Sequence, residues 1–323
     1  MDTYLVTGAA GFIGRSIAAE LLARGKRVRG IDNFSTGKRE NLLGLEAMDF
    51  VEADINDAAT IAEACRGVDC VFHEAAIPSV PRSIQDPIAS NYAGVSGTVQ
   101  LLVAARNAKV RRIVYAGSSS CYGNTPTLPK TEDMIPNPIS PYAVAKLAGE
   151  YYMQSFTRVY GLETVTLRYF NVFGPYQDPT SQYSGVLAIF ALKMLAGKAP
   201  TIYGDGEQSR DFTFIQNVVH GNLLASEAPA DRVSGKVFNL ATGNRITLNQ
   251  AVEVMRKATG YTGEVRHSPE RGGDVKHSLA AISLARQCFG YEPLVQFQEG
   301  LKRTVDWYRI TAKTVSVGVG GAQ

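Results

Sequence analysis

Cysteine is scarce in this chain of 323 residues. The four cysteines show neither the spacing of metal ligands nor the density of a disulfide scaffold: Cys65, Cys70, Cys121 and Cys288. We therefore expect each of them to pack in the interior of a protein kept in a reducing compartment. No metal site is predicted.

Long basic runs are also missing. The 33 lysines and arginines are scattered among 30 acidic residues, and the formal net charge is only +3. Because no basic stripe is interleaved with aromatic residues, the sequence gives little support to nucleic-acid binding. Binding of small anionic ligands is compatible with this charge.

No apolar run approaches the roughly 20 residues that a membrane-spanning helix needs. The nearest stretch, GVLAIFALKMLAG (185–197), is interrupted by Lys193. The first expected strand begins at Thr3, which leaves no room for a signal peptide, so we expect a cytoplasmic protein with no membrane partner. Residues 312–323 are small and rich in glycine, and we expect a loose tail there.

Short β-branched runs alternate with segments that are apolar at helical spacing. Six runs are expected to be strands: 4–7, 27–31, 49–53, 69–73, 111–116 and 163–169. Alternation of this kind predicts an α/β fold with a doubly wound parallel sheet. We expect one domain from 1–170 and about 212–240, and a smaller mixed α/β substrate-binding region from about 171–211 and 241–311.

The turn TGAAGFIG (7–14) follows the first expected strand and opens the first helix. Gly8, Gly11 and Gly14 permit a tight turn in which backbone N–H groups approach a pyrophosphate. Asp32 ends the second strand, where a carboxylate holds a ribose 2′-hydroxyl and repels a 2′-phosphate. The pattern therefore predicts a dinucleotide site that favours NAD over NADP. Asp54, after the third strand, is a candidate for the adenine edge, and a surface-turn residue is the competing interpretation.

The stretch SPYAVAK (140–146) carries the strongest catalytic signal. Ser140 can cap a helix that begins at Pro141, which puts Tyr142 and Lys146 on one helical face. A cation about 4 Å from the phenol contributes about 4 kcal/mol at an effective dielectric constant of about 20. That corresponds to about 3 pK units and predicts a pKa of Tyr142 near 7.

Three adjacent serines stand in GSSSCYG (117–123), directly after the fifth expected strand. Serine clusters at such positions are often turn or helix-cap residues. Because the cluster lies between the glycine-rich turn and the Tyr142–Lys146 pair in the order that a hydride-transfer site requires, a catalytic role is the competing interpretation.

The chain resembles the extended short-chain dehydrogenase/reductase family, which has a Rossmann fold. The resemblance rests on TGAAGFIG, DNFSTGKRENL, HEAA, GSSSCYG, SPYAVAK, LRYFNVFGP and GDGEQSRDF, which span most of residues 3–280. Within this family it is most similar to nucleotide-sugar 4-epimerases, in particular bacterial UDP-N-acetylglucosamine 4-epimerases, through SVPRSIQDPI, LPKTED, SPYAVAK and RGGDVKHSLAAIS.

The resemblance implies a redox-neutral cycle at sugar C4 with bound NAD. Tyr142 would be the base, Lys146 would hold the nicotinamide ribose, and Ser118 would bind the reacting oxygen. Ser119 would share the proton path, and Ser120 would face the C2 substituent. Further cofactor contacts are implied at Phe12, Ile13, Asn33, Gly37, Ile55, Ala75, Ala76 and Asn91.

The resemblance also assigns the substrate side. Asn171, Arg210 and Arg271 match the positions that bind the UDP pyrophosphate, and Ser79 is a candidate sugar contact. Ser278 falls where a bulky aromatic residue would exclude N-acetyl groups, so UDP-GlcNAc and UDP-GalNAc are expected substrates beside UDP-Glc and UDP-Gal. Pro78 stands where N-acetyl-preferring relatives carry glycine, which implies a differently shaped loop.

Several alternatives stay open. A 4,6-dehydratase or decarboxylase needs an acid pair after the active-site hydroxyl, where this chain has Ser119 and Ser120. An NAD-sensing regulatory protein would commonly lose the Tyr142–Lys146 pair, and a UDP-glucuronate 4-epimerase is a further possibility. HEAAI (73–77) lacks the second histidine of a zinc motif, so we interpret His73 and Glu74 as a strand end beside the cofactor. The family resemblance implies a homodimer through residues 92–106 and 142–160.

Overall fold

A seven-stranded parallel sheet forms the centre of the computed structural model, which describes residues 1–178, 185–270 and 276–318. The strand order is β11-β6-β5-β4-β1-β2-β3, and every neighbouring pair is parallel. The strands are β1 (Thr3–Thr7), β2 (Arg27–Asp32), β3 (Asp49–Glu52), β4 (Cys70–His73), β5 (Arg112–Ser118), β6 (Glu163–Tyr169) and β11 (Lys236–Leu240). The predicted doubly wound α/β fold is confirmed, and all six predicted strands are present.

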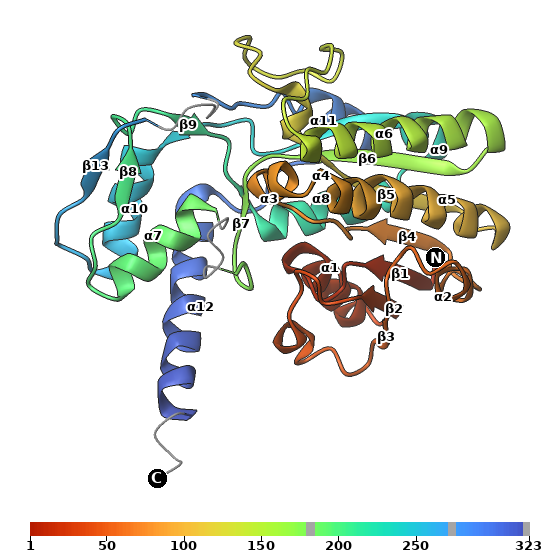
Figure 1. Cartoon of the computed structure of the whole chain (residues 1–323), viewed down its shortest axis with the longest axis horizontal. Helices are drawn as coiled ribbons and strands as arrows, with labels where there is room; N and C mark the ends of the chain where they lie inside the picture. The colour runs from red at the N-terminus through yellow and green to blue at the C-terminus, as the bar shows by residue number, and fades with distance from the viewer. Residues whose placement is uncertain (179–184, 271–275, 319–323) are drawn as a thin grey trace.

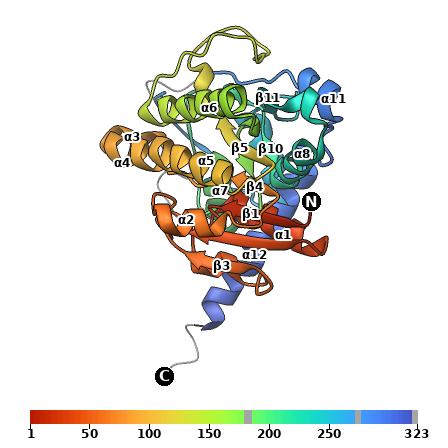
Figure 2. The ribbon, with the colours of Figure 1, turned by 90° about the vertical axis from the view of Figure 1, so that its right-hand side faces the viewer.

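Helices cover both faces of the sheet, as Figure 2 shows with the sheet between them. On one face lie α2 (Ala58–Ala64), α5 (Gly97–Asn107) and α6 (Pro141–Tyr160); α1 (Phe12–Ala23) and α8 (Ile215–Glu227) lie on the other. Each face buries its own apolar core, with Leu101 and Met153 in the first and Ile17 and Val218 in the second. Strands β2 and β4 pair with opposite edges of β1, so the direction in which strands are added to the sheet reverses at β1. In sheets of this kind ligands bind at such a reversal point.

A second group of elements lies to one side of the sheet (Figure 1). It contains α7 (Val186–Leu195), β8 (Thr201–Tyr203), α10 (Leu248–Thr259) and β13 (Arg266–Ser268), with α12 (Phe297–Gly318) packed against α10. The expectation of a loose tail from residue 312 is wrong for its first part, because α12 continues to Gly318. The remaining residues, 319–323, lie outside the described part of the chain.

Short elements complete the connections. They are η1 (Arg39–Leu42), α3 (Val80–Gln85), α4 (Pro87–Asn91), η2 (Tyr92–Ser96), η3 (Ser119–Tyr122), β7 (Val172–Phe173), β9 (Ser209–Arg210), β10 (Thr213–Phe214), α9 (Ala230–Val233), β12 (Ile246–Thr247) and α11 (Ser283–Phe289). η2 is a π-helical turn that joins α4 to α5.

Two sequence-based exclusions can be compared with the structure. No helix in residues 1–178, 185–270 and 276–318 has the length and hydropathy that a membrane crossing requires. Within the same ranges, no group of three or more acidic, histidine or cysteine side chains is placed to bind a metal.

Cys65, Cys70 and Cys121 are buried and Cys288 is partly buried, as expected of packing residues.

Candidate active site

The start of α6 places Tyr142. The Ser140 hydroxyl accepts a hydrogen bond of 3.2 Å from the Ala143 amide, and Pro141 occupies the first helical position, so the predicted cap is confirmed. The Tyr142 amide cannot be satisfied inside its own helix at this position, and it donates to the Ser83 hydroxyl of α3 at 3.0 Å. This hydrogen bond therefore joins helix α6 to helix α3 at Tyr142, the predicted base.

One turn further along α6, Lys146 reaches back to the end of β5. Its side chain is only 4% exposed, and its ammonium donates a hydrogen bond of 2.8 Å to the Ala116 carbonyl oxygen. The ammonium also lies 5.0 Å from the centre of the Tyr115 ring. Burial lowers the pKa of Lys146, and the negative charge of Glu74 opposes that shift.

The pKa of Tyr142 moves opposite to the sequence-based expectation. Its pKa is raised to about 12: burial raises it most, a hydrogen bond with the Ser118 side chain lowers it, and the charge of Glu74 adds to the rise. The Lys146 ammonium is held at the Ala116 carbonyl oxygen. In the protein chain alone the phenol is therefore protonated at neutral pH.

The serine cluster continues directly from β5. The Ser118 hydroxyl accepts hydrogen bonds from the Ser120 amide at 3.2 Å and the Ser120 hydroxyl at 2.8 Å, and so caps η3. Ser119 begins η3 between them. Ser118 is thus a cap and also a neighbour of the Tyr142 phenol, so the two interpretations of the cluster are compatible.

The glycine-rich turn has the conformation expected of a phosphate cradle. Gly8 has φ +69°, and a Cβ added at Gly14 would collide with the Gly8 carbonyl oxygen. Gly11 is the residue before α1 and has no side chain that could cap the helix. The backbone amides of Phe12 and Ile13 in the first turn are therefore not bonded to a capping side chain. These amides are therefore suited to bind an anion.

Asp32 lies at the end of β2, against this turn. It is 8% exposed and accepts hydrogen bonds from the Ala10 amide at 2.9 Å and the Phe34 amide at 2.8 Å. Gly37 packs closely on Ala10. Beside them, the Asn33 side chain donates to the Asp54 carboxylate at 2.7 Å, which brings two predicted cofactor residues together.

The other predicted cofactor residues surround the same turn or lie on the α5 side of the sheet. Ala75, with Ala76 next to it, packs on Gly8, and the Ala75 amide donates to the Thr7 hydroxyl at 3.2 Å. Ile55 contacts Gly97 at the start of α5. Asn91 is the last residue of α4, directly before the π-helical turn η2.

Three of the predicted substrate residues, Asn171, Arg210 and Ser278, lie around β9. The Asn171 amide group donates to the Asp211 carbonyl oxygen at 3.3 Å, directly beside Arg210. Arg210 donates to the Lys276 carbonyl oxygen at 3.1 Å, and the Ser278 amide donates to the Ser209 carbonyl oxygen at 3.0 Å. Arg210 and Ser278 are thus held on paired segments, whereas Arg271 lies outside the described residues.

Ser79 has a structural task. Its hydroxyl accepts a hydrogen bond of 3.2 Å from the Arg82 amide and caps α3. Its carbonyl oxygen accepts from the Ser83 amide at 3.0 Å, and Ser83 in turn binds the Tyr142 amide. Ser79 therefore stabilises α3, the helix whose Ser83 binds the Tyr142 amide. A contact between Ser79 and the sugar stays a prediction.

Comparison with known proteins assigns these features to a family. Residues 4–241 match the NAD dependent epimerase/dehydratase family. The chain belongs to the NAD-dependent epimerase/dehydratase family. NAD is the cofactor of this family, and the predicted family resemblance is confirmed.

Individual relatives of this NAD-dependent epimerase/dehydratase differ in their sugars. A UDP-glucose 4-epimerase of Mycolicibacterium smegmatis is 41% identical over 94% of this chain and 98% of the relative. A UDP-glucuronate 4-epimerase of Thermodesulfobacterium geofontis is 34% identical over 95% and 96%. The structure of a UDP-N-acetylglucosamine 4-epimerase from Methanobrevibacter ruminantium, solved with UDP-N-acetylmuramic acid, superposes with a TM-score of 0.91 at 37% identity, covering 96% of this chain and 99% of that one.

The cradle of this family member fits NAD. The closely packed glycine turn admits no further carbon atom at Gly14, which leaves the backbone amides free to approach a pyrophosphate. The buried Asp32 carboxylate suits a ribose 2′-hydroxyl and would repel the 2′-phosphate of NADP. Gly8, Gly11, Phe12 and Ile13 would hold the pyrophosphate, and Asp32 would hold the adenosine ribose.

Sequence reasoning missed three residues that support the site. Ser83 anchors the Tyr142 amide, while Tyr169 donates a hydrogen bond of 2.8 Å to Glu74. Glu74 was expected to end a strand, and its charge acts on both Tyr142 and Lys146. The available signal was weak: an acid directly after the run CVFH (70–73), in which only the histidine is polar, invites a search for a buried counter-charge.

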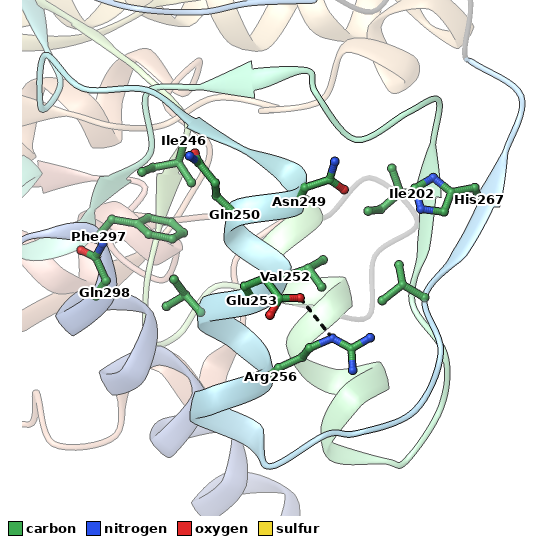
Figure 3. A pocket seen from close by; sticks show the side chains of 12 residues that line it. Ile202, Ile246, Asn249, Gln250, Val252, Glu253, Arg256, His267, Phe297 and Gln298 are labelled. Carbon is green, nitrogen blue, oxygen red and sulfur yellow. Dashed lines mark ion pairs between the residues drawn. The ribbon is translucent and has the colours of Figure 1, made fainter.

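A separate hollow of about 620 Å³ lies along α10 in the smaller group of elements (Figure 3). Ile202, Val252, Phe297 and His267 contribute to its lining, and Glu253 pairs with Arg256 at 3.5 Å. None of the residues predicted for catalysis, cofactor or substrate lines it.

Proposed function

We propose that the protein is a UDP-sugar 4-epimerase that interconverts UDP-GlcNAc with UDP-GalNAc and UDP-Glc with UDP-Gal. The observation that carries the proposal is the meeting of Tyr142, Lys146 and Ser118 at the end of β5, without an acid pair beside them. The named activities of the relatives, which all invert C4 of a UDP-sugar, support the reaction type.

In this mechanism Tyr142 removes the proton of the sugar 4-hydroxyl and later returns it. NAD, held by the Gly8 turn and Asp32, would supply the acceptor and later the donor of the C4 hydride, and its positive charge would favour the phenolate that burial opposes. Lys146 would bind the nicotinamide ribose. Ser118 hydrogen-bonds the reacting oxygen, with Ser119 on the proton path.

The absence of carboxylates at 119 and 120 argues for inversion and against elimination. Loss of water from the sugar needs an acid and a base beside C5 and C6. Hydroxyl groups with ordinary acidity cannot replace them, and the Ser120 hydroxyl is already bonded to Ser118 at 2.8 Å. The 4-keto sugar formed here therefore has one productive outcome, which is reduction.

The UDP end must stay anchored while the 4-keto sugar turns over. Asn171 and Arg210 would bind the pyrophosphate, because amide and guanidinium groups donate to its oxygens. Both are held by carbonyl oxygens near β9, which fixes their side chains before substrate arrives. Arg271, outside the described residues, remains a predicted third anchor.

Ser278 supports acceptance of N-acetylated sugars. Its small side chain is 9% exposed, and its amide is fixed to the strand that carries Arg210, one of the anchors of the pyrophosphate. A serine at this position leaves volume for the acetamido group at C2, which an aromatic ring would fill. UDP-GlcNAc is therefore the preferred test substrate, with UDP-Glc and UDP-glucuronate as the comparisons.

The function is tested by proton NMR time courses with purified protein and each of these three UDP-sugars. The anomeric signal of UDP-GalNAc should grow from UDP-GlcNAc, and that of UDP-Gal from UDP-Glc. If only UDP-glucuronate is converted, the proposed substrates are wrong and the protein is a UDP-glucuronate 4-epimerase. A flat trace for all three sugars, with NAD still bound, would support a sensor instead.

We also propose that two copies of the chain associate through residues 92–106 and 142–160, which lie in η2, α5 and α6. Large apolar side chains of η2 and α6 are exposed, including Tyr92 at 54%, Val144 at 52% and Tyr151 at 53%. Light scattering coupled to size-exclusion chromatography should give twice the mass of the chain. A Tyr151→Glu variant should lower that mass toward one chain, and a wild-type monomer would refute the proposal.

A further inference from the structure

Glu74 directly follows β4, at the edge of the sheet where the end of β5 binds the Lys146 ammonium. The register pairs His73 at the end of β4 with Tyr115 on β5. The next residues along these strands, Glu74 and Ala116, therefore lie at the same level, on neighbouring strands spaced about 5 Å apart. The Ala116 carbonyl oxygen is the acceptor for the Lys146 ammonium.

A buried ammonium needs an opposite charge. Lys146 is 4% exposed, and one carbonyl oxygen does not neutralise it. After burial itself, Glu74 exerts the largest influence on this lysine, followed by Cys121. Burial raises the pKa of the Cys121 thiol to about 12, so that group is neutral. Glu74 is the acid that can serve.

The carboxyl of Glu74 is fixed from its other side. The Tyr169 hydroxyl, at the end of β6, donates to it at 2.8 Å. That hydroxyl accepts from the Asn222 side chain of α8, also at 2.8 Å. Tyr169 is 8% exposed and Asn222 is fully buried, so this chain of hydrogen bonds holds the carboxylate in place.

We propose that Glu74 is a positioning residue for the Tyr142–Lys146 pair: its carboxylate, held by Tyr169, is the counter-charge of Lys146 and sets the pH range in which the pair works. The activity part of this proposal rests on the proposed epimerase function. The electrostatic part concerns residues of this chain alone.

The remaining groups around Glu74 are neutral. Burial raises the pKa of Tyr115 and of Tyr169 well above the usual range, and lowers the pKa of His73 to about 3. Burial raises the pKa of Glu74 itself, while Tyr169 and Lys146 counteract that rise. Glu74 and Lys146 are therefore both charged only in a limited pH window, above the pKa of Glu74 and below that of Lys146.

The direction of the effect follows from the charges. A carboxylate at 74 makes loss of a proton harder at both Tyr142 and Lys146, so it raises both pKa values. Changing Glu74 to Gln removes the charge and keeps the shape. Both limbs of the pH profile should then move to lower pH together, whereas damage to packing would lower its height without moving it.

The first experiment measures the lysine directly. Protein containing [ε-¹³C]lysine is titrated by NMR without substrate, and the Lys146 signal is assigned by its loss in Lys146→Met. Its midpoint should fall by roughly one pH unit or more in Glu74→Gln, and Glu74→Asp should restore part of the difference. An unchanged midpoint in Glu74→Gln would overturn the proposal.

A matched control is Glu132→Gln. Glu132 is a partly buried carboxyl that accepts a hydrogen bond of 2.8 Å from the Asn239 amide, and an amide oxygen can still accept it. This variant should leave the Lys146 midpoint and the pH profile unmoved. A shift of equal size in this control would show a general effect of lost charge and would count against Glu74.

The second experiment records kcat against pH for wild type, Glu74→Gln and Glu132→Gln with UDP-GlcNAc and UDP-Glc. A joint shift of both limbs in Glu74→Gln supports the proposal, and an unshifted profile contradicts it. If the wild type converts no UDP-sugar, the proposed function fails, while the lysine titration still decides the role of Glu74.

Discussion

Lys146 of α6 donates a hydrogen bond of 2.8 Å to the Ala116 carbonyl oxygen of β5, and this bond joins the catalytic helix to the strand that ends in Ser118. The Lys146→Met variant keeps an apolar stem in the buried space and removes the cation. Turnover should fall by roughly 10- to 100-fold, because a hydrogen bond from a charged group to the nicotinamide ribose contributes about 1.5 to 3 kcal/mol. Progress curves with UDP-Glc measure it, and Lys198→Met, at an exposed lysine, should keep wild-type rates.

Asp32 should determine which dinucleotide is bound. Its carboxylate is buried at the end of β2 and accepts hydrogen bonds from the Ala10 and Phe34 amides. Hydrogen bonds to a charged group contribute about 1.5 to 3 kcal/mol, so Asp32→Ala should weaken NAD by roughly 10- to 100-fold. Chromatography of the nucleotide released on denaturation should show less NAD per chain. Full NAD occupancy would contradict this role.

Ser278 should control the size of the C2 substituent. In Ser278→Tyr, turnover of UDP-GlcNAc should become undetectable while that of UDP-Glc persists, because the ring fills the volume that the acetamido group needs. Parallel assays of both sugars measure the change. Ser278→Ala should leave both rates close to wild type, and unchanged UDP-GlcNAc turnover in Ser278→Tyr would disprove the assignment.

Arg168 and Glu150 form an ion pair of 2.6 Å behind the active site, with both side chains 2% exposed. Arg168 also lies 4.6 Å from the centre of the Tyr122 ring, next to the serine cluster. Removing one partner of a buried pair costs about 3 to 5 kcal/mol, so Glu150→Ala should lower the free energy of unfolding by that amount. Urea denaturation at constant NAD measures it. Glu20→Ala, which removes an exposed pair with Arg24, should cost less than about 1 kcal/mol.

The parallel sheet was predictable because its strands carry their signal locally. Runs such as 163–169 are β-branched and are followed or preceded by helical periodicity. The seventh strand, β11, was not identified, since its five residues pair with β6 from more than sixty residues away. Only the folded chain shows that this segment completes the sheet.

The candidate site divides in the same way. Tyr142 and Lys146 could be found from their spacing on one helix, and the Gly8 turn from its position after a strand. The pKa of Tyr142 could not, because its direction depends on how deeply the phenol is buried and on Glu74, which comes from another strand. Likewise, Ser79 was expected to meet sugar, and the structure shows its hydroxyl capping α3.

The most direct test of the central claim is the fate of the hydrogen at C4. UDP-GlcNAc carrying deuterium at C4 of the sugar is incubated with the wild-type protein, and the UDP-GalNAc formed is analysed by mass spectrometry and NMR. Hydride transfer between C4 and a retained NAD predicts that the product keeps the deuterium at C4, now with inverted stereochemistry, and that Tyr142→Phe forms almost no product. Loss of the deuterium to solvent in the wild-type reaction would contradict the account.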